Sequence, residues 1–328
     1  MRVLLFNQRQ IRWGLLFLLI TVFTAGIAAN WTSLSRQFIG VKPGVRLEGY
    51  NVQGYLPEEV AVLVKALAGK FNREPRNASY FPETGEIIPA ETGRVVDVGR
   101  TVHQVCLAPA GTRTKLYINA VPPSITEELF KPIFKGNDPK RAALAINVAW
   151  GEEHLDEILQ VLDEEKVKAT FFFVGTWVKL FPEKVKEIGS RGHELANHGL
   201  FHGHPAQMGR DQIKKLIADN ALLLWSVTGK KTANLFAPPY GELSPEVLAA
   251  AGDLGYYTIL WSVDTVDWKN PAPDAMLNRV LAKIEPGGII LMHPTIATRT
   301  ALRGMIRGLR QKGLEPGTVS QVLQQPGS

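Results

Sequence analysis

From residue 142 the chain contains in succession Ala142-Ala-Leu-Ala-Ile-Asn-Val148, Leu155-Asp-Glu-Ile-Leu-Gln-Val-Leu-Asp163 and Lys168-Ala-Thr-Phe-Phe-Phe-Val174. The first and third stretches are almost continuously apolar, which is typical of strands buried on both faces. The second stretch repeats its apolar residues at the helical period, with polar residues between them. A buried strand, an amphipathic helix and a second buried strand in this order predict a parallel β/α unit.

The same alternation continues as far as residue 310. Strands are predicted from Glu194 and at 234–237, 256–263 and 288–292, and helices at 183–189, 211–227, 244–254, 273–284 and 299–310. Six or seven β/α units favour a closed barrel over an open sheet. The sequence therefore predicts an α/β fold in which the strands form a barrel and the helices cover it.

Polar residues gather where four of the predicted strands end. These ends read Asn197-His198-Gly-Leu-Phe-His202, Phe236-Ala-Pro-Pro-Tyr-Gly241, Trp261-Ser-Val-Asp-Thr-Val-Asp-Trp268 and Leu291-Met-His-Pro294. In a β/α barrel the carboxyl ends of the strands meet at one face, where sites are built. His198 and His202 have a spacing at which two imidazoles can bind one metal ion. The neighbouring His193 and His204 are expected to be loop or surface residues.

In the order and spacing of these motifs, residues 141–325 resemble the polysaccharide deacetylases, the NodB-homology fold of carbohydrate esterase family four. The resemblance implies a deformed (β/α)7 barrel. It also implies a metal-dependent hydrolase that removes N-acetyl groups, and in some members O-acetyl groups, from chitin-like sugars or peptidoglycan. The expected partner is therefore peptidoglycan or another N-acetylated glycan.

The resemblance assigns roles to individual residues. His198 and His202 fall on the metal-binding histidines, and the implied cofactor is a divalent transition metal, with zinc the expected ion. His293 falls on the general acid, and Asp264 on the carboxylate that tunes this histidine. The backbone N–H of Tyr240 falls where the family holds the oxyanion of the reaction.

Further residues fall on the substrate pocket, and one motif departs from the family. Trp268 and Leu291 fall on the pocket for the acetyl methyl group, and Pro239 belongs to the same candidate surface. Asn147-Val-Ala-Trp-Gly151 stands where the family has Thr-Phe-Asp-Asp-Gly. Ala149 therefore replaces the general base, and Trp150 replaces the metal carboxylate. Ala237 stands where the family has the arginine that pairs with the base.

These replacements leave three functions open, and whether the chain is an enzyme remains undecided. An altered metal hydrolase would use His198, His202 and His293, with an acid from Glu152 or Glu153 in place of the lost carboxylate. A pseudoenzyme would bind glycan in the old groove, with Trp150, Tyr240 and Trp268 as aromatic platforms. A scaffold would bind partners in wall or spore assembly. Exported, sporulation-associated members of the family resemble this chain in the Asn-Val-Ala-Trp-Gly motif.

The N-terminus predicts export. Arg2, Arg9 and Arg12 precede an uncharged run from Trp13 to Ser35, so residues 1–35 are a signal-anchor or a cleaved signal peptide. Basic residues before the apolar run favour a cytoplasmic N-terminus. The rest of the chain is then expected outside the cytoplasm, held at the cell membrane, or secreted if the peptide is cleaved.

Residues 36–135 are predicted to form a small α+β domain ahead of a barrel domain at 136–328. Strands are expected at Gly44–Gly54, 78–81, 86–90 and 116–121, and a helix at 56–68. The region resembles the small peptidoglycan-binding domain found beside several exported wall enzymes. The net charge is +6 without a long basic run, which for an exported chain fits an anionic wall or lipid surface and argues against nucleic acid.

Overall fold

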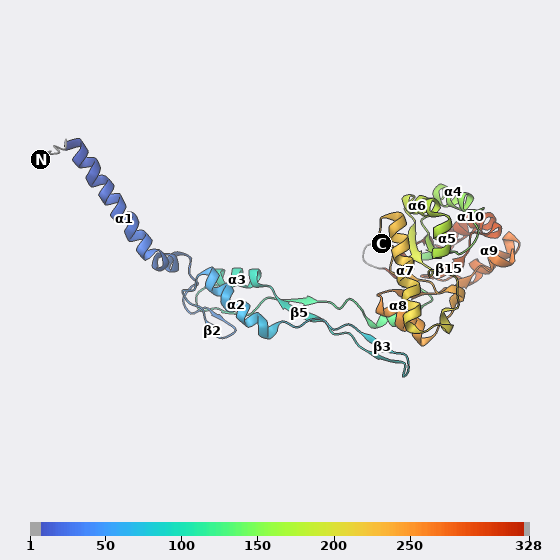
Figure 1. Cartoon of the computed structure of the whole chain (residues 1–328), viewed down its shortest axis with the longest axis horizontal. Coiled ribbons are helices and arrows are strands. Elements are labelled where there is room, and N and C mark those ends of the chain that lie inside the picture. Colours follow the sequence, from blue (N-terminus) through green and yellow to red (C-terminus); the bar gives the residue numbers. More distant parts are fainter. Residues whose placement is uncertain (1–7, 325–328) are drawn as a thin grey trace. The chain divides into compact units, whose positions relative to one another are not determined.

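The computed structural model describes residues 8–324, so Arg2 lies outside the described residues. Contacts between residues divide the chain into two units (Figure 1). The first contains the residues up to 76 together with 91–123, and the second contains 77–90 together with the residues from 124 onward. The domain boundaries expected at 35/36 and 135/136 stay predictions.

The uncharged run Trp13–Ser35 lies within one helix, α1 (Gln8–Ile39). Its segment Arg12–Ile39 has a mean hydropathy of 1.8, and its side chains are not buried. Among residues 8–324 it is the one helix that is long and apolar enough to cross a membrane. A signal-anchor and a cleaved signal peptide remain the two predictions for it.

The first strand predicted in the front unit is wrong. Residues 44–54 contain a hairpin of β1 (Arg46–Leu47) and β2 (Tyr50–Asn51). Glu48 and Gly49 both have positive φ, 46° and 88°, which is the backbone of a two-residue hairpin turn. Alternation of polar and apolar residues identified the strands, but it could not show where the chain reverses.

The helix predicted at 56–68 is confirmed as α2 (Pro57–Phe71). Its first turn is closed by Glu59, whose side chain accepts a 2.9 Å hydrogen bond from the N–H of Leu56. The unit also contains α3 (Val98–Leu107), which the sequence did not predict. Its remaining strands are β5 (Gly93–Val96), β6 (Arg113–Thr114) and β7 (Ile118–Val121).

The second unit is built on a parallel sheet. Within residues 8–324 this sheet has nine strands in the order β14-β15-β9-β10-β11-β12-β13-β8, with β16 also beside β9. The strands are β8 (Pro132–Ile133), β9 (Arg141–Val148), β10 (Thr170–Phe173), β11 (Glu194–Asn197), β12 (Leu235–Phe236), β13 (Tyr257–Ile259), β14 (Val263–Asp264), β15 (Ile289–Met292) and β16 (Glu315–Gly317). The predicted α/β architecture is confirmed.

Helices surround this sheet (Figure 1). They are α4 (Leu155–Glu164), α5 (Gly175–Leu180), α6 (Pro182–Ser190), α7 (Arg210–Thr228), α8 (Pro245–Asp253), α9 (Pro273–Lys283), α10 (Ile296–Gln311) and α11 (Val319–Leu323). Five of the predicted helices correspond to α6–α10, while α5 and α11 were missed because each is short. The unit also carries the hairpin of β3 (Ser79–Phe81) and β4 (Glu86–Ile88), both predicted.

The barrel does not close through a continuous ladder of hydrogen bonds. The strand predicted at 256–263 is divided into β13, which pairs with β8, and β14, which pairs with β15. Between them the Leu260 N–H donates to the Ile133 carbonyl at 2.7 Å, and the Ser262 N–H donates to the Ile289 carbonyl at 3.0 Å. The chain itself therefore crosses from one edge of the sheet to the other, which makes the barrel deformed.

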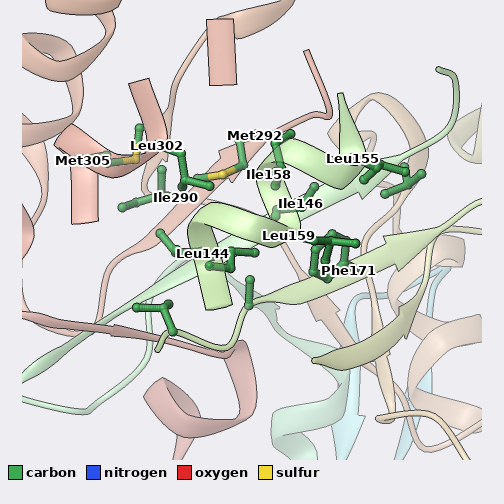
Figure 2. Close-up of a cluster of buried hydrophobic side chains, with 14 of the residues drawn as sticks. Leu144, Ile146, Leu155, Ile158, Leu159, Phe171, Ile290, Met292, Leu302 and Met305 are labelled. Carbon is green, nitrogen blue, oxygen red and sulfur yellow. The ribbon is translucent and has the colours of Figure 1, made fainter. Parts of the chain in front are cut away.

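The central strand β9 is buried on both faces. Leu144 and Ile146 pack outward against α4 and α10, in the cluster that Figure 2 shows. Ala143 and Ala145 belong to a second cluster, inside the barrel. Since successive side chains of a strand point to opposite faces, Asn147 continues the inward row. Small residues in this row leave room at the carboxyl end of the strand.

His193 lies at the opposite end of the barrel from that space, in the loop before β11, as one of the two expected alternatives has it, but it is buried and not at the surface. Its side chain is buried, and its Nδ1 accepts a hydrogen bond from the Ala169 N–H at 3.2 Å. The ring packs edge-on against Phe171. Burial, reinforced by the charge of Lys168, lowers the pKa of His193 to about 4.

We predict that acid destabilises the protein through His193. Because its pKa is lower in the folded than in the unfolded state, the unfolded chain binds the proton more tightly, and stability falls as the pH drops from about 6.5 toward 4. In His193→Asn, the Oδ1 of the asparagine can replace Nδ1 as the acceptor. As the pH falls through this window, the free energy of unfolding of this variant should therefore decrease less than that of wild type, by on the order of 1 kcal/mol per pH unit. Thermal melts from pH 7 to pH 4.5 measure this slope.

The matched control is Phe171→Leu, which loosens the same packing without removing a titrating group. It should lower the melting temperature at every pH and keep the wild-type slope. Equal slopes in wild type and His193→Asn would contradict the prediction.

Candidate functional site

A cavity of about 460 Å³ opens at the carboxyl ends of the barrel strands. It is lined by Asn147, Trp150, His198, His202, Tyr240, Gly241, Trp261, Asp264, Trp268, Leu291 and His293. These residues come from all four predicted strand ends and from the end of β9. The convergence expected of a parallel barrel therefore takes place.

His198 is held by the backbone. Its ring is buried, and its Nδ1 lies 2.6 Å from the Ala237 carbonyl oxygen. A carbonyl only accepts, so Nδ1 carries the proton and the lone pair of the neutral ring is on Nε2. Burial lowers the pKa of His198 to about 3. Burial, with the charge of His293, also lowers the pKa of His202.

The carboxylate partner of His293 is Asp267, so the role assigned to Asp264 was wrong. Asp267 Oδ1 lies 2.8 Å from His293 Nδ1, and Oδ2 accepts the His293 N–H at 2.6 Å. Thr298 donates a further hydrogen bond to Oδ2. Burial by itself would raise the pKa of Asp267, but the hydrogen bond and charge of His293 hold it below its usual value. Asp264 lines the cavity and accepts the N–H of Val266 at 2.7 Å.

A strained turn places these two aspartates. Val266 has φ 56°, which is unfavourable for a β-branched residue. The turn leaves Asp264 at the cavity wall and directs Asp267 to the histidine beneath it. Strain of this kind persists where the surrounding structure holds it, typically at functional sites. Counting residues along Trp261–Trp268 could not choose between the two aspartates, because the choice depends on this turn.

The indole of Trp150 covers His293. The two rings are stacked with centroids 5.0 Å apart and an interplanar angle of 25°. The same indole meets His202 edge-on at 6.3 Å, and His202 meets His198 edge-on at 5.2 Å. An aromatic side chain thus stands among the three histidines, at the position where the resemblance in sequence implies the family's metal carboxylate.

Tyr240 is held from both sides at the mouth of the cavity. His202 packs edge-on against its ring at 4.4 Å, and His204 stacks on it at 4.4 Å and 7°. His204 Nδ1 lies 2.7 Å from a carboxylate oxygen of Glu242. Tyr240 has φ 59°, a rare conformation for a residue other than glycine. His204 is the exposed loop residue that was expected, and it also supports a wall of the site.

The remaining substrate candidates divide into those at the cavity and one that is not. Leu291 is buried at the cavity wall, and Trp268 stands exposed at its rim with the Lys269 ammonium 4.8 Å from its ring centroid. Pro239 is buried and does not line the cavity. Trp261 lines it although the sequence did not single it out as a site residue. Asn147 had no role assigned from the sequence beyond its place in the motif Asn147–Gly151. Its inward position on β9 brings it to the cavity.

The residues present do not fit a three-ligand metal site. In the described part of the chain, no group of three or more His, Cys, Asp or Glu side chains is placed to hold a metal ion. The Glu153 carboxylate accepts a hydrogen bond from the Glu152 N–H at 3.0 Å, so it is bound to the backbone of its own loop. The backbone hydrogen bonds lower the pKa of Glu153. Neither glutamate lines the cavity, and Trp150 offers only an N–H donor.

Comparisons with known proteins identify the family of this chain. A model of the polysaccharide deacetylase family matches residues 135–259. The uncharacterised protein YlxY of Bacillus subtilis (strain 168) is 33% identical over 261 residues, which cover 79% of this chain and 81% of that protein. The chain belongs to the polysaccharide deacetylase family. The resemblance seen in the sequence is therefore confirmed.

The polysaccharide deacetylase family includes peptidoglycan and chitooligosaccharide deacetylases. A peptidoglycan-N-acetylglucosamine deacetylase of Bacillus cereus is 34% identical over 177 residues, which are 52% of this chain and 64% of the enzyme. Family enzymes of this type depend on a metal ion.

Among solved structures, a CE4 family pseudoenzyme from Bacillus anthracis matches with a TM-score of 0.58 and 34% identity, over 80% of this chain and 94% of that one. A mutant of the same pseudoenzyme with restored enzymatic activity matches equally well, with a TM-score of 0.58 and 33% identity over 80% of this chain and 97% of that one.

We predict that Asp267→Asn and Asp264→Asn have different effects. The first change removes a buried charge that holds His293 through two hydrogen bonds, and it should cost about 1–3 kcal/mol of stability. Without the carboxylate, the proton of the neutral His293 ring should also no longer be fixed on Nδ1. Asp264→Asn should stay within about 0.5 kcal/mol of wild type. Thermal melts and the ¹⁵N chemical shifts of the His293 ring measure the two effects, and a larger effect of Asp264→Asn would restore the original assignment.

Proposed function

We propose that this chain is a membrane-anchored, glycan-binding member of the deacetylase family that does not hydrolyse acetyl groups. The observation that carries the proposal is the stack of Trp150 on His293, with the same indole against His202. The side chain that would bind a metal in an active enzyme is here an apolar wall. The match to a CE4 family pseudoenzyme over 80% of the chain supports the proposal.

The site lacks two groups that the hydrolysis of an acetyl group needs. A hydrolase needs a group that takes the proton from the attacking water, and a positioned base contributes about 10²–10⁴ in rate. Ala149 has no such group. A catalytic metal site typically has three protein ligands, and His198 with His202 supplies two. We therefore propose that the site retains no stoichiometric transition metal.

The same residues form a surface suited to sugar. Trp150, Tyr240 and Trp268 are exposed at the cavity, and aromatic rings bury large apolar areas while their edges remain available to polar groups. The walls are mainly apolar with a few polar side chains among them, as is usual for a ligand site. The family's substrates are acetylated wall glycans, so we propose that the ligand is peptidoglycan or a related glycan.

We propose that α1 anchors the chain in the cell membrane and leaves the two folded units on the wall side. The front unit then adds a second contact with the wall, in line with its resemblance to a peptidoglycan-binding domain. A role in sporulation stays a prediction.

We predict that the purified full-length protein binds oligomers of N-acetylglucosamine but releases no acetate from them. Trp268→Ala should weaken binding by about five- to tenfold, because the sugar ring loses the indole on which it stacks. Trp225→Ala removes an equally exposed tryptophan on α7, outside the cavity, and should leave affinity unchanged. Calorimetric titration, acetate assay and metal analysis check these outcomes. Acetate release that disappears in His198→Ala would overturn the proposal in favour of a divergent hydrolase.

We predict that three substitutions together restore metal binding and deacetylation: Ala149→Asp, Trp150→Asp and Ala237→Arg. They replace the base, the metal carboxylate and the arginine that pairs with the base. Ala237 is buried, so Ala237→Arg alone should destabilise the protein by several kcal/mol, and the new Asp at 149 should offset most of that loss. A well-folded triple variant without metal or activity would show that these positions were assigned wrongly.

A further inference from the structure

Asn147 carries a buried polar atom without a partner. It is 4% exposed, and its Oδ1 forms no hydrogen bond with any residue that the structure describes. Asn147 is the inward residue nearest the end of β9, after Ala143 and Ala145. It lines the cavity, and together with Trp261 and Leu291 it also borders a small void at the cavity floor.

An unpaired buried oxygen is costly, by about 1–3 kcal/mol relative to a paired one. Buried polar groups in folded proteins are nearly always hydrogen-bonded. Asn147 lines the cavity, so a ligand that reaches its Oδ1 can supply the missing partner, which recovers this free energy on binding. Thr258 offers a comparison, since its Oγ1 is also buried and unpaired, but Thr258 does not line the cavity.

The surroundings of Asn147 indicate the kind of donor. Leu291 and the ring of Trp261 give apolar walls beside it, which suit a methyl group. Tyr240 also lines the cavity, and its backbone N–H is not among the donors of the loop and cap hydrogen bonds in the described residues. A secondary acetamide has one N–H, one carbonyl oxygen and one methyl group. The cavity thus supplies one acceptor, one donor and an apolar wall.

We propose that Asn147 determines the specificity of this site: its Oδ1 accepts the amide N–H of a 2-acetamido sugar, so the cavity binds N-acetylated and rejects O-acetylated glycan. An acetate ester has the same shape as the acetamide, but an oxygen replaces the N–H. The ester oxygen cannot donate a hydrogen bond. Its lone pairs would face those of Oδ1, and both oxygens would stay without a donor. A site built around a hydrogen bond discriminates strongly against a ligand that lacks it. The inference rests on the proposed binding of glycan in this cavity.

The test compares two ligands and two kinds of variant of the full-length protein. The ligands are the methyl β-glycosides of 2-acetamido-2-deoxyglucose and of 2-O-acetylglucose, with affinities measured by ligand-observed NMR. Wild type should bind the amide roughly 5- to 20-fold more tightly than the ester. Asn147→Leu and Asn147→Val should lower the amide to the affinity of the ester and leave the ester unchanged.

Stability provides a second readout. Replacing an unpaired buried oxygen by an apolar group removes its desolvation cost, so at least one Asn147 variant should melt at or above the wild-type temperature. Thr258→Val is the matched control, because it removes another unpaired buried oxygen away from the cavity. It should stabilise the protein similarly and keep the wild-type preference for the amide.

Three results would overturn the inference. One is equal binding of amide and ester by wild type, which would mean that Asn147 donates to the shared carbonyl group. Another is an Asn147 variant that keeps the preference. The third is a Thr258→Val protein that loses it. In each case the sugar still binds and the proposed function stands, whereas a wild type that binds neither glycoside nor the longer oligomers would overturn both.

Discussion

The burial of β9 on both of its faces is the constraint on which the barrel depends. Its outward residues Leu144 and Ile146 require a helical layer, which α4 and α10 provide. Its inward residues are small, so the strands on either side approach closely around a narrow interior. Because the neighbouring strands run parallel to β9, their carboxyl ends open at one face. The candidate site is a consequence of this arrangement, since every element that supplies it ends there.

At that face one substitution reorganises the chemistry. An aspartate at position 150 would direct negative charge at His198 and His202, and a metal ion would hold the three together. A tryptophan there supplies no ligand, and its ring is stabilised by stacking on His293 and by the edge of His202. The resemblance also implies the loss of the base at position 149 and of the arginine at position 237, and these two losses are consistent with each other, because an arginine buried without its carboxylate would be strongly destabilising. The remaining histidines have hydrogen-bond partners: the Nδ1 of His198 lies against the Ala237 carbonyl, and the Nδ1 of His293 lies against the Asp267 carboxylate.

Much of the fold was predictable because its signals are local. The runs of apolar residues at 142–148 and 168–174 identified β9 and β10, and helical periodicity located α7, α8 and α9 within a few residues. The failures share another cause. The hairpin at 44–54 depends on positive φ at Glu48 and Gly49, and the division of the strand at 256–263 depends on which neighbours accept its hydrogen bonds. Neither is visible in the periodicity of side chains.

The sequence by itself determined the family, the α/β barrel and the apolar N-terminal helix, because each follows from the identity and spacing of residues along the chain. Its resemblance to the family also implied that the base and the metal carboxylate are absent at positions 149 and 150. Only the tertiary structure decided that Asp267 rather than Asp264 holds His293, that His204 supports Tyr240, and that Asn147 lines the cavity and carries a buried oxygen without a partner. The reason is physical. Hydrogen bonds and ring contacts depend on the direction of a side chain, and that direction is set by turns and strand registers formed with distant parts of the chain.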